Sequence, residues 1–268
     1  MKSKRSFAAL LGSIVLAVAL LPGTASQAHV HAAAAAPQPE FYLALGDGLT
    51  AGYQGDSSIA WSHGWAFQLR DMLARTMPTV LVDLGHTGEC TGTFIKGGMA
   101  KGCPKSTDSP SQLAEATAFL ADHYGVVRLI TVQVGADDLY GSLPAFMSGT
   151  QAQQQALLAK LTPTMAHNWG TIFATLRKAC PSCQIVALNQ FNPYPSGAIK
   201  VDLTQLFQTY TQLLQQAATP AIVTVADIAT PFVGHELAYT WMSKGRPDPT
   251  TAGFTAIAKA VSKVIAAG

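Results

Sequence analysis

The chain has 268 residues, of which 49% are hydrophobic, and a formal net charge of +2 at pH 7. This length and this apolar content suit one large domain with a substantial buried core. A net charge this small does not suggest a nucleic-acid partner, because a protein that neutralises phosphates needs a large excess of basic residues.

The first 28 residues have the three-part form of a secretory signal peptide. Three basic residues among the first five precede an apolar run at 7–21, and a segment of small residues that ends at Ala28 follows. The apolar run is too short to span a bilayer comfortably, and no cysteine for a lipid anchor follows it. Cleavage after Ala28 leaves 14 basic and 15 acidic residues, a net charge of about −1. We therefore expect a freely secreted monomer with no membrane span after cleavage.

Residues 29–40 form a low-complexity segment that is rich in Ala, Pro and His. We interpret this segment as a solvated tether, and the alternative is a weak metal site at His29 and His31. Residues 41–268 are then expected to form the single folded domain.

All four cysteines lie in the exported part of the chain, which favours disulfides over a thiol–metal site. Three pairings are possible, and we favour Cys90 with Cys103 and Cys180 with Cys183, since each pair closes a short loop. The Cys-x-x-Cys pattern at Cys180 is also compatible with a redox motif or half a zinc site. However, there is no second Cys-x-x-Cys, and this one follows a predicted helix rather than beginning one.

Five short apolar stretches are predicted as strands, at 41–45, 79–84, 128–134, 184–188 and 221–225. Helical spacing of apolar residues predicts helices between them, at 62–76, after a Ser109-Pro110 cap, at 151–160, at 163–179, around 203–214 and at 252–266. The segment between Gly85 and Asp108 is expected to be a long glycine-rich loop. Strands that are apolar on both faces and alternate with helices indicate a parallel sheet covered on both sides. We therefore expect an α/β fold with three α/β/α layers and a five-stranded parallel sheet.

Three of the predicted strands end in glycine-containing turns, which include Gly46, Gly88 and Gly135. In folds of this kind, the ligand site gathers at the carboxyl ends of the strands. We therefore expect these turns to meet the loop that precedes the last helix.

Four segments, in order, resemble the sequence blocks of the SGNH (GDSL-type) hydrolases. The first is Leu-Gly-Asp-Gly-Leu-Thr-Ala-Gly at 45–52, where the family reads Gly-Asp-Ser-Leu-Thr-x-Gly. The others lie at 84–89, at 130–139 and at 248–253, where the family's last block begins with His-Pro. The resemblance covers nearly the whole exported chain, and it implies a flavodoxin-like three-layer fold and an ancestry among hydrolases of lipid or acetyl esters.

The family's mechanism uses a serine nucleophile, a histidine that accepts its proton and an aspartate that orients the histidine, with a glycine and an asparagine as oxyanion donors. In this chain, the positions of the serine, asparagine, histidine and oxyanion glycine are Gly48, Asp137, Asp248 and Gly88. The orienting aspartate falls on Gly245, or on Arg246 in the family's variant spacing. By this resemblance, only Gly88 is kept.

Each substitution removes something that the mechanism needs. Gly48 has no hydroxyl, and an ionised Asp137 places an acceptor where a donor must meet the developing oxyanion. The loss of one such donor costs about 100- to 1000-fold in rate. Asp248 is a possible base, but it has no hydroxyl at position 48 to activate. We therefore expect the serine mechanism to be lost and the protein to bind a small acylated lipid or carbohydrate, with no cofactor.

The alternative is an active hydrolase whose catalysis has been relocated. Ser57 imitates the nucleophile motif, but it lies in a polar loop with no apolar run before it. Thr50 lies closer to the original site, although a hydroxyl that caps a helix is the simpler interpretation. His86, beside the second block, is either a polar loop residue or a base that faces the cleft.

Carboxylates offer a second kind of relocated chemistry. Asp137 and Asp248 are expected to approach each other, with Asp47 and Glu89 nearby as candidate binding residues. Two close carboxylates share a proton, hold a cation or act as an acid–base pair. In the simpler interpretation, Asp47 and Asp138 satisfy loop amides, as aspartates at turns commonly do.

Overall fold

The computed structural model describes residues 39–54, 63–104, 108–199 and 201–266. The predicted signal peptide, the tether up to residue 38 and Ser57 lie outside the described residues, so the predictions for them remain predictions.

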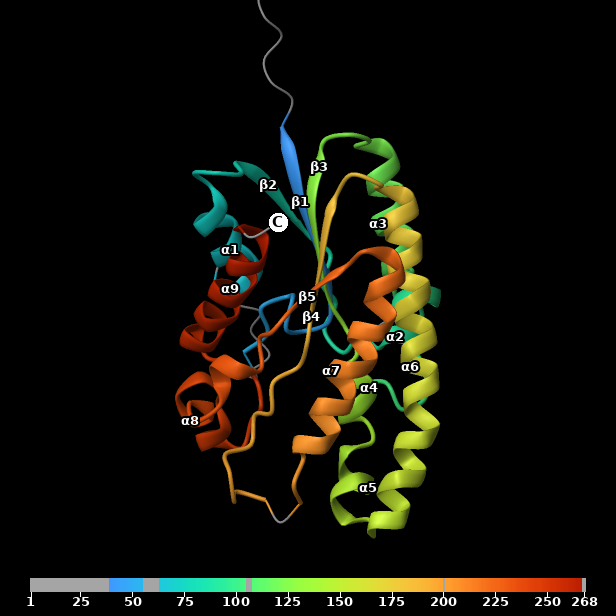
Figure 1. Ribbon diagram of the computed structural model, residues 1–268, viewed down its shortest axis with the longest axis vertical. Helices are drawn as coiled ribbons and strands as arrows, with labels where there is room; N and C mark the ends of the chain where they lie inside the picture. The colour runs from blue at the N-terminus through green and yellow to red at the C-terminus, as the bar shows by residue number, and fades with distance from the viewer. Residues whose placement is uncertain (1–38, 55–62, 105–107, 200, 267–268) are drawn as a thin grey trace, which may run out of the picture. The chain divides into compact units, whose positions relative to one another are not determined.

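The sheet has five parallel strands in the order β2-β1-β3-β4-β5 (Figure 1). The strands are β1 (Glu40–Gly46), β2 (Thr79–Asp83), β3 (Val127–Gln133), β4 (Gln184–Leu188) and β5 (Thr224–Ala226). This confirms the predicted parallel sheet. Side chains from Tyr42 to Leu45 on β1 are fully buried, because helices cover both faces of the sheet.

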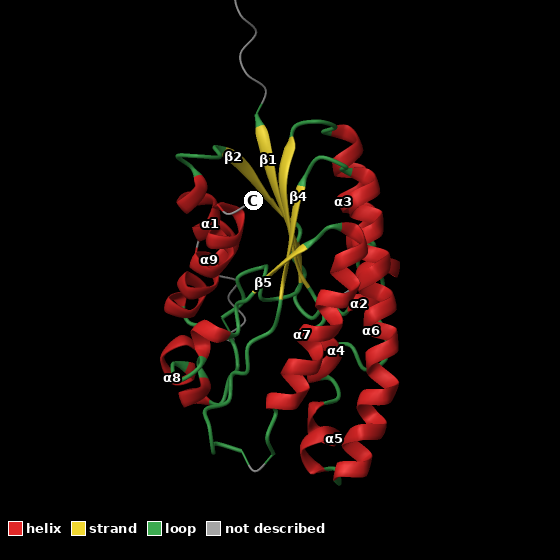
Figure 2. Cartoon of the chain, in the orientation of Figure 1, coloured by secondary structure: helices red, strands yellow, loops and turns green. Residues whose placement is uncertain are grey.

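The helices are α1 (Trp65–Leu73), α2 (Thr91–Lys96), α3 (Gln112–Asp122), α4 (Ala136–Tyr140), α5 (Leu143–Ser148), α6 (Gln151–Ala179), α7 (Thr204–Ala218), α8 (Glu236–Tyr239) and α9 (Thr251–Ala266). Helices α1 and α9 cover one face of the sheet, and α3, α6 and α7 cover the other (Figure 2). Successive strand residues point to opposite faces. Tyr42 and Ala44 therefore join the core under α1 and α9, whereas Leu43 and Leu45 join the core on the other side. The three-layer α/β/α architecture is thus confirmed.

Two predicted boundaries differ from the structure in the second half of the chain. The fifth strand begins at Thr224, not at Ala221, because Pro220 and Ala221 belong to a 3-10 turn and Ile222 has a left-handed φ of +53°. Helix α6 is continuous, although two segments were predicted on either side of Pro163. Proline removes one helical hydrogen bond, but the buried face of α6 continues beyond it, from Met165 to Leu176.

The segment between β2 and β3 also differs from its prediction. The expected glycine-rich loop contains α2, whose Phe94 is fully buried. Helix α3 begins after Ser111, whose hydroxyl accepts a hydrogen bond from the Ala114 amide at 3.1 Å, and not after Ser109-Pro110. A free side-chain acceptor near the first turn therefore decides where this helix starts.

Both predicted disulfides are present, Cys90–Cys103 and Cys180–Cys183. The first links the start of α2 to the loop that precedes α3, and the second links the end of α6 to the segment that leads into β4. Among the described helices, none combines the length and the apolar character needed to cross a membrane.

Candidate functional site

The turn after β1 is held by contacts that only glycine permits. Gly46 has a φ of +147°, and a Cβ at this position would collide with the Gln133 carbonyl oxygen of the neighbouring strand. Gln112 of α3 fastens the same residue: its Oε1 accepts from the Gly46 amide at 2.6 Å, and its Nε2 donates to the Gly46 carbonyl at 2.9 Å. Residues 47 and 48 are thereby fixed beyond the end of the sheet.

A cavity of about 420 Å³ lies at this end of the sheet. The predicted site residues that line it are Asp47, Gly48, Gly88, Asp137 and Asp248. They come from the turn after β1, the loop after β2, the start of α4 and the loop before α9. The structure thus brings all four resembling segments together around one space.

Three other predicted site residues do not line this cavity. Gly245 ends a 3-10 helix at Met242–Lys244 with a φ of +72°. Thr50 is buried, and its hydroxyl donates to the Leu45 carbonyl at 3.2 Å. Glu89 is fully buried. Its Oε2 lies 3.2 Å from Nδ1 of His86, which also does not line the cavity.

The cavity carboxyl groups lie in an environment that favours their protonated forms. Burial, followed by the charge of Asp137, raises the pKa of Asp47 well above its usual range. Burial and the charges of Asp138 and Asp248 raise the pKa of Asp137 to about 7. Burial also raises the pKa of Asp248. At neutral pH the cavity therefore favours a mixture of protonated and ionised carboxyl groups.

A buried amide lies against Asp47 and can match either of its protonation states. The Gln133 side chain is fully buried between Asp47 and Gln190, and its Nε2 donates to Gln190 Oε1 at 3.2 Å. In this orientation, the Gln133 oxygen faces the carboxyl group, so a protonated Asp47 donates to it. If the amide is reversed, its nitrogen donates to an ionised Asp47. In the reversed arrangement the hydrogen bond from Gln133 lowers the pKa of Asp47, against the larger effect of burial.

Asp138, the neighbour of Asp137, stabilises the fold. It accepts hydrogen bonds from the Thr91 amide at 2.8 Å and from the Thr91 hydroxyl at 2.7 Å, and Asn168 of α6 donates to that same hydroxyl at 2.9 Å. Asp47 likewise accepts from the Leu49 amide at 2.9 Å. Asp47 therefore satisfies a turn amide, as the simpler interpretation of the sequence proposed, whereas Asp138 satisfies the first amide of helix α2 instead of a loop amide.

Several cavity residues have no counterpart among the sequence predictions: Tyr53, Thr87, Tyr140, Gln190 and Phe191. Gln190 and Phe191 come shortly after β4, so the rule that strand ends form the site could have identified them. Tyr140 ends the short helix α4, and no motif marks it.

The described residues that line the cavity offer hydroxyl, amide and carboxyl groups as their polar side-chain chemistry. Among the described residues that line it, none is Ser, His or Cys. Within the described part of the chain, no group of three or more His, Cys, Asp or Glu side chains is arranged to hold a metal ion. Two carboxyl groups, Asp137 and Asp248, line the cavity together with Asp47.

Comparisons with known proteins agree with this geometry. The model of the GDSL-like lipase/acylhydrolase family matches residues 44–256. Among curated proteins, none gives a significant sequence match.

Solved structures with the same fold include esterases and lipases. The acetylxylan esterase Axe2 from Geobacillus stearothermophilus is 13% identical, with a TM-score of 0.59 over 84% of this chain and 94% of that one. The lipase Lip_vut3 from a goat rumen metagenome is 19% identical, with a TM-score of 0.61 over 85% and 97% of the two chains. The extracellular lipase from Streptomyces rimosus is 15% identical, with a TM-score of 0.59 over 84% and 99%. These identities support the shared fold alone, whereas the family model spans most of the sequence. The chain therefore belongs to the GDSL-like lipase/acylhydrolase family, as the resemblance implied.

Proposed function

We propose that this protein is a secreted, ligand-binding member of its family that has lost the serine mechanism. The observation that carries the proposal is the position of Gly48, which faces the cavity with no Ser, His or Cys among the described lining residues. Secretion is supported by the signal-like residues 1–28 and by the two disulfides, which are typical of exported proteins.

A neutral acyl compound, derived from a lipid or a carbohydrate, fits the cavity best. The volume lies in the range of small-molecule sites, and Leu49 and Phe191 provide apolar walls. A protonated Asp137 can donate a hydrogen bond to a carbonyl oxygen, whereas the ionised form repels it. Because the pKa of Asp137 is raised to about 7, the binding form predominates below neutral pH.

Calorimetry with the mature protein tests this proposal. The probes are N-acylethanolamines with short, medium and long chains, which are neutral and contain no ester. We expect binding to be about tenfold tighter at pH about 5.5 than at pH about 8.5, the effect of one hydrogen bond. Asp137→Asn should bind equally at both pH values, because its amide donates at either pH.

The matched control is Asp122→Asn, an exposed position on α3, which should keep the wild-type pH dependence. Absence of binding at both pH values would overturn the proposal. The same holds for a pH dependence that survives in Asp137→Asn.

A second candidate is an ester hydrolase that uses the carboxyl pair. It is favoured because Asp137 and Asp248 line one cavity and both have a raised pKa, as acid–base residues often do. Such an enzyme should hydrolyse nitrophenyl acetate with a rate that changes near pH 7, and either Asp→Asn variant should abolish turnover. If the wild-type protein shows no turnover, this candidate is excluded.

A further inference from the structure

Helix α7 carries an unusual solvent face. None of its 15 residues is charged, and its exposed positions are held by Gln and Thr. Surface helices normally place charged residues opposite their buried stripe. The buried stripe of α7 is ordinary, with Leu206, Phe207, Tyr210 and Leu214 packed into the core. Packing therefore does not explain why the solvent face of α7 has no charged residue.

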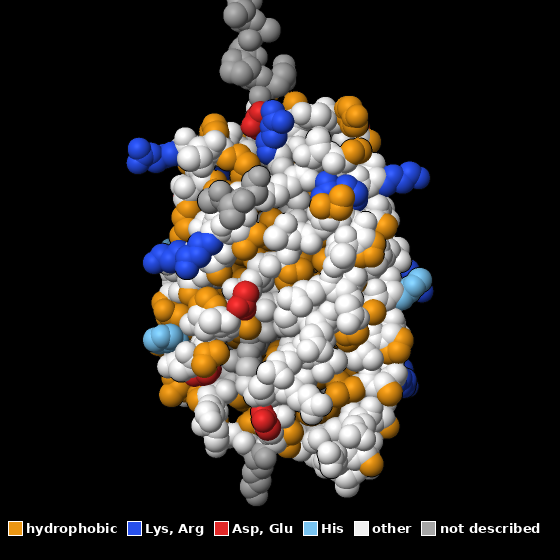
Figure 3. Space-filling model, in the orientation of Figure 1, with side chains coloured by type: hydrophobic (Ala, Val, Ile, Leu, Met, Phe, Trp, Pro, Cys, Tyr) orange, Lys and Arg blue, Asp and Glu red, His pale blue; other side chains and the backbone are white. Residues whose placement is uncertain are grey.

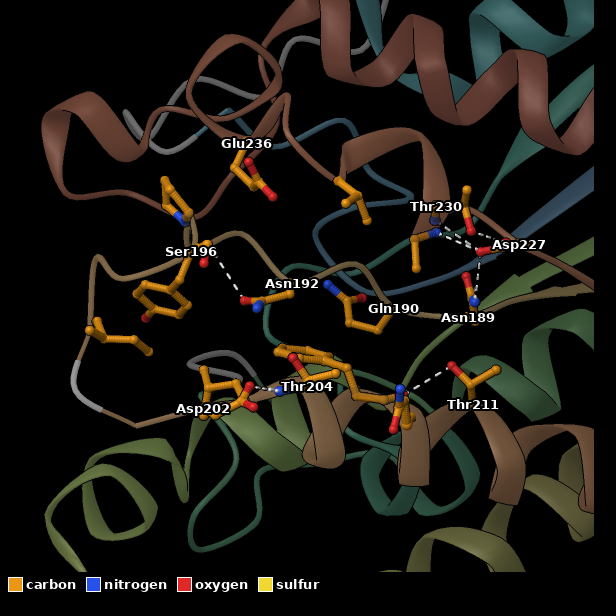
Figure 4. Close-up of a pocket in the computed structure, with 18 of the residues that line it drawn as sticks. Asn189, Gln190, Asn192, Ser196, Asp202, Thr204, Thr211, Asp227, Thr230 and Glu236 are labelled. Carbon is orange, nitrogen blue, oxygen red and sulfur yellow. Dashed lines mark hydrogen bonds between the residues drawn. The ribbon is translucent and has the colours of Figure 1, made fainter.

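This face lines a groove of about 1010 Å³. The groove is distinct from the cavity of about 420 Å³ lined by Asp47, Asp137 and Asp248, which is called the carboxyl-lined cavity below. In Figure 4, Thr204 and Thr211 of α7 lie across the groove from Glu236 and Thr230, and Gln190 lies between them. Figure 3 shows uncharged side chains with isolated Asp and Glu side chains over the middle and lower part of this face, whereas the visible Lys and Arg side chains lie toward its upper part and margins.

The groove is lined by exposed amides and by an aromatic ring. Gln208 and Gln212 are exposed on α7, and each primary amide can donate and accept at the same time. Tyr194, on the loop after β4, is half-buried, and burial raises its pKa, so its hydroxyl stays neutral. A ring face together with amide groups complements a sugar, which has C–H faces and hydroxyls that both donate and accept.

The charged side chains among the described lining residues of the groove do not favour an anionic ligand. Among its described lining residues, none is Lys or Arg, and the charged ones are Asp202, Asp227 and Glu236. Each of these carboxylates already accepts a backbone amide: from Thr204 at 2.8 Å, from Ala229 at 3.0 Å and from Gly234 at 3.0 Å, respectively. They therefore fasten the walls of the groove, and their remaining oxygen lone pairs suit hydroxyl donors.

We propose that this groove, defined by Tyr194, Thr204, Gln208, Gln212 and Glu236, binds a neutral oligosaccharide chain. The site does not require the carboxyl-lined cavity to be filled, so it goes beyond the function proposed above. Gln190 lines both spaces and is the link between them. A sugar chain in the groove can thus present an acyl substituent to the cavity, a consequence that does rest on the proposed function.

The test applies the mature protein to an array of immobilised neutral, uronic-acid and glucosamine oligosaccharides. The best neutral binder is then measured by calorimetry. The double variant Gln208→Ala/Gln212→Ala should weaken its binding about tenfold or more, the effect of losing one or two hydrogen bonds. Tyr194→Ala should weaken it at least as much, because the ring face is lost.

The matched control is Gln205→Ala/Gln216→Ala, which changes two exposed glutamines of the same helix that do not line the groove. It should bind like the wild type. Retention of charged oligosaccharides alone, or of none, would overturn the proposal. Equal binding by the groove variants and the wild type would do so as well. Loss of acylethanolamine binding with intact sugar binding would count only against the function of the carboxyl-lined cavity.

Discussion

Gly48 occupies a backbone position with room for a side chain. A Cβ there would lie 3.5 Å from Tyr53 Cβ and 3.6 Å from Thr87 Cγ2, both ordinary van der Waals distances. Its φ is not among the positive values, unlike that of Gly46 two residues earlier. The missing hydroxyl is therefore not imposed by the fold.

Gly48→Ser should consequently leave the protein folded. We expect a change in unfolding free energy within about 1 kcal/mol, because serine adopts the native conformation without strain. Gly46→Ser should cost more than about 3 kcal/mol, since its Cβ meets the Gln133 carbonyl oxygen. Urea denaturation measures the unfolding free energy of both variants. Equal stabilities would show that Gly46 does not approach the Gln133 carbonyl oxygen as closely as the structure shows.

The site residues that sequence could identify are those that belong to the family's blocks. Asp137 and Asp248 are 111 positions apart in the chain, yet the blocks assign both to one site, where the structure places them. The raised pKa of Asp137 could not be predicted, because it depends on burial and on the neighbouring charges. The same holds for Gln112, whose two hydrogen bonds to Gly46 join segments 66 positions apart.

One side chain of helix α3 is hydrogen-bonded to the end of strand β1. Gln112 has no exposed surface and satisfies both the amide and the carbonyl of Gly46, where the strand ends. Its Nε2 also lies 3.5 Å from the buried Glu89 carboxyl group. The element that carries Gly48 is therefore positioned from the helical layer as well as from the sheet.

Gln112→Ala should destabilise the protein by about 2–4 kcal/mol, because a buried amide and carbonyl each lose a partner. The same substitution at the exposed Gln216 of α7 should change stability by less than about 0.5 kcal/mol. Thermal and urea unfolding of the two variants provide the comparison. A Gln112→Ala protein as stable as the control would contradict the role given to this contact.

The elements that sequence could predict are the long and periodic ones. Buried strands are recognisable in the sequence as apolar runs. The predicted start of α9 lies within one residue of its observed start at Thr251. Helices α2, α4 and α5 have six residues or fewer, too few turns for a periodic pattern. The predicted start of β5 is wrong because the apolar run in the sequence gives no sign that its first residues form a 3-10 turn.

Across the whole molecule, buried carboxyl groups set the pH dependence of stability. The groups whose pKa is raised are Asp47, Asp83, Asp137, Asp138 and Asp248, with values of about 6 for Asp83 and about 7 for Asp137. A raised pKa means that the folded protein binds these protons more tightly than the unfolded chain does. Their contribution to stability is complete below about pH 4, the unfolded value, and is lost as pH rises through the folded values.

We therefore expect the unfolding free energy to fall as the pH rises from about 4 to about 7. Asp137→Asn should flatten this fall and raise stability at pH 7 by about 1–3 kcal/mol, since one pKa unit corresponds to about 1.4 kcal/mol and the side chain is only half-buried. Urea unfolding across this pH range measures both effects. A stability that rises with pH would show that these carboxyl groups are ionised in the folded state at little cost.

The loss of the serine mechanism is tested most directly by intact-mass measurement of the mature protein after incubation with a fluorophosphonate, which phosphonylates activated hydroxyl nucleophiles. The wild-type protein should show no adduct, because Gly48 provides no hydroxyl and no histidine lines the described cavity. A stoichiometric adduct that disappears in Thr87→Ala, Thr50→Ala or Ser57→Ala would contradict this, because it would identify a relocated nucleophile in an active hydrolase.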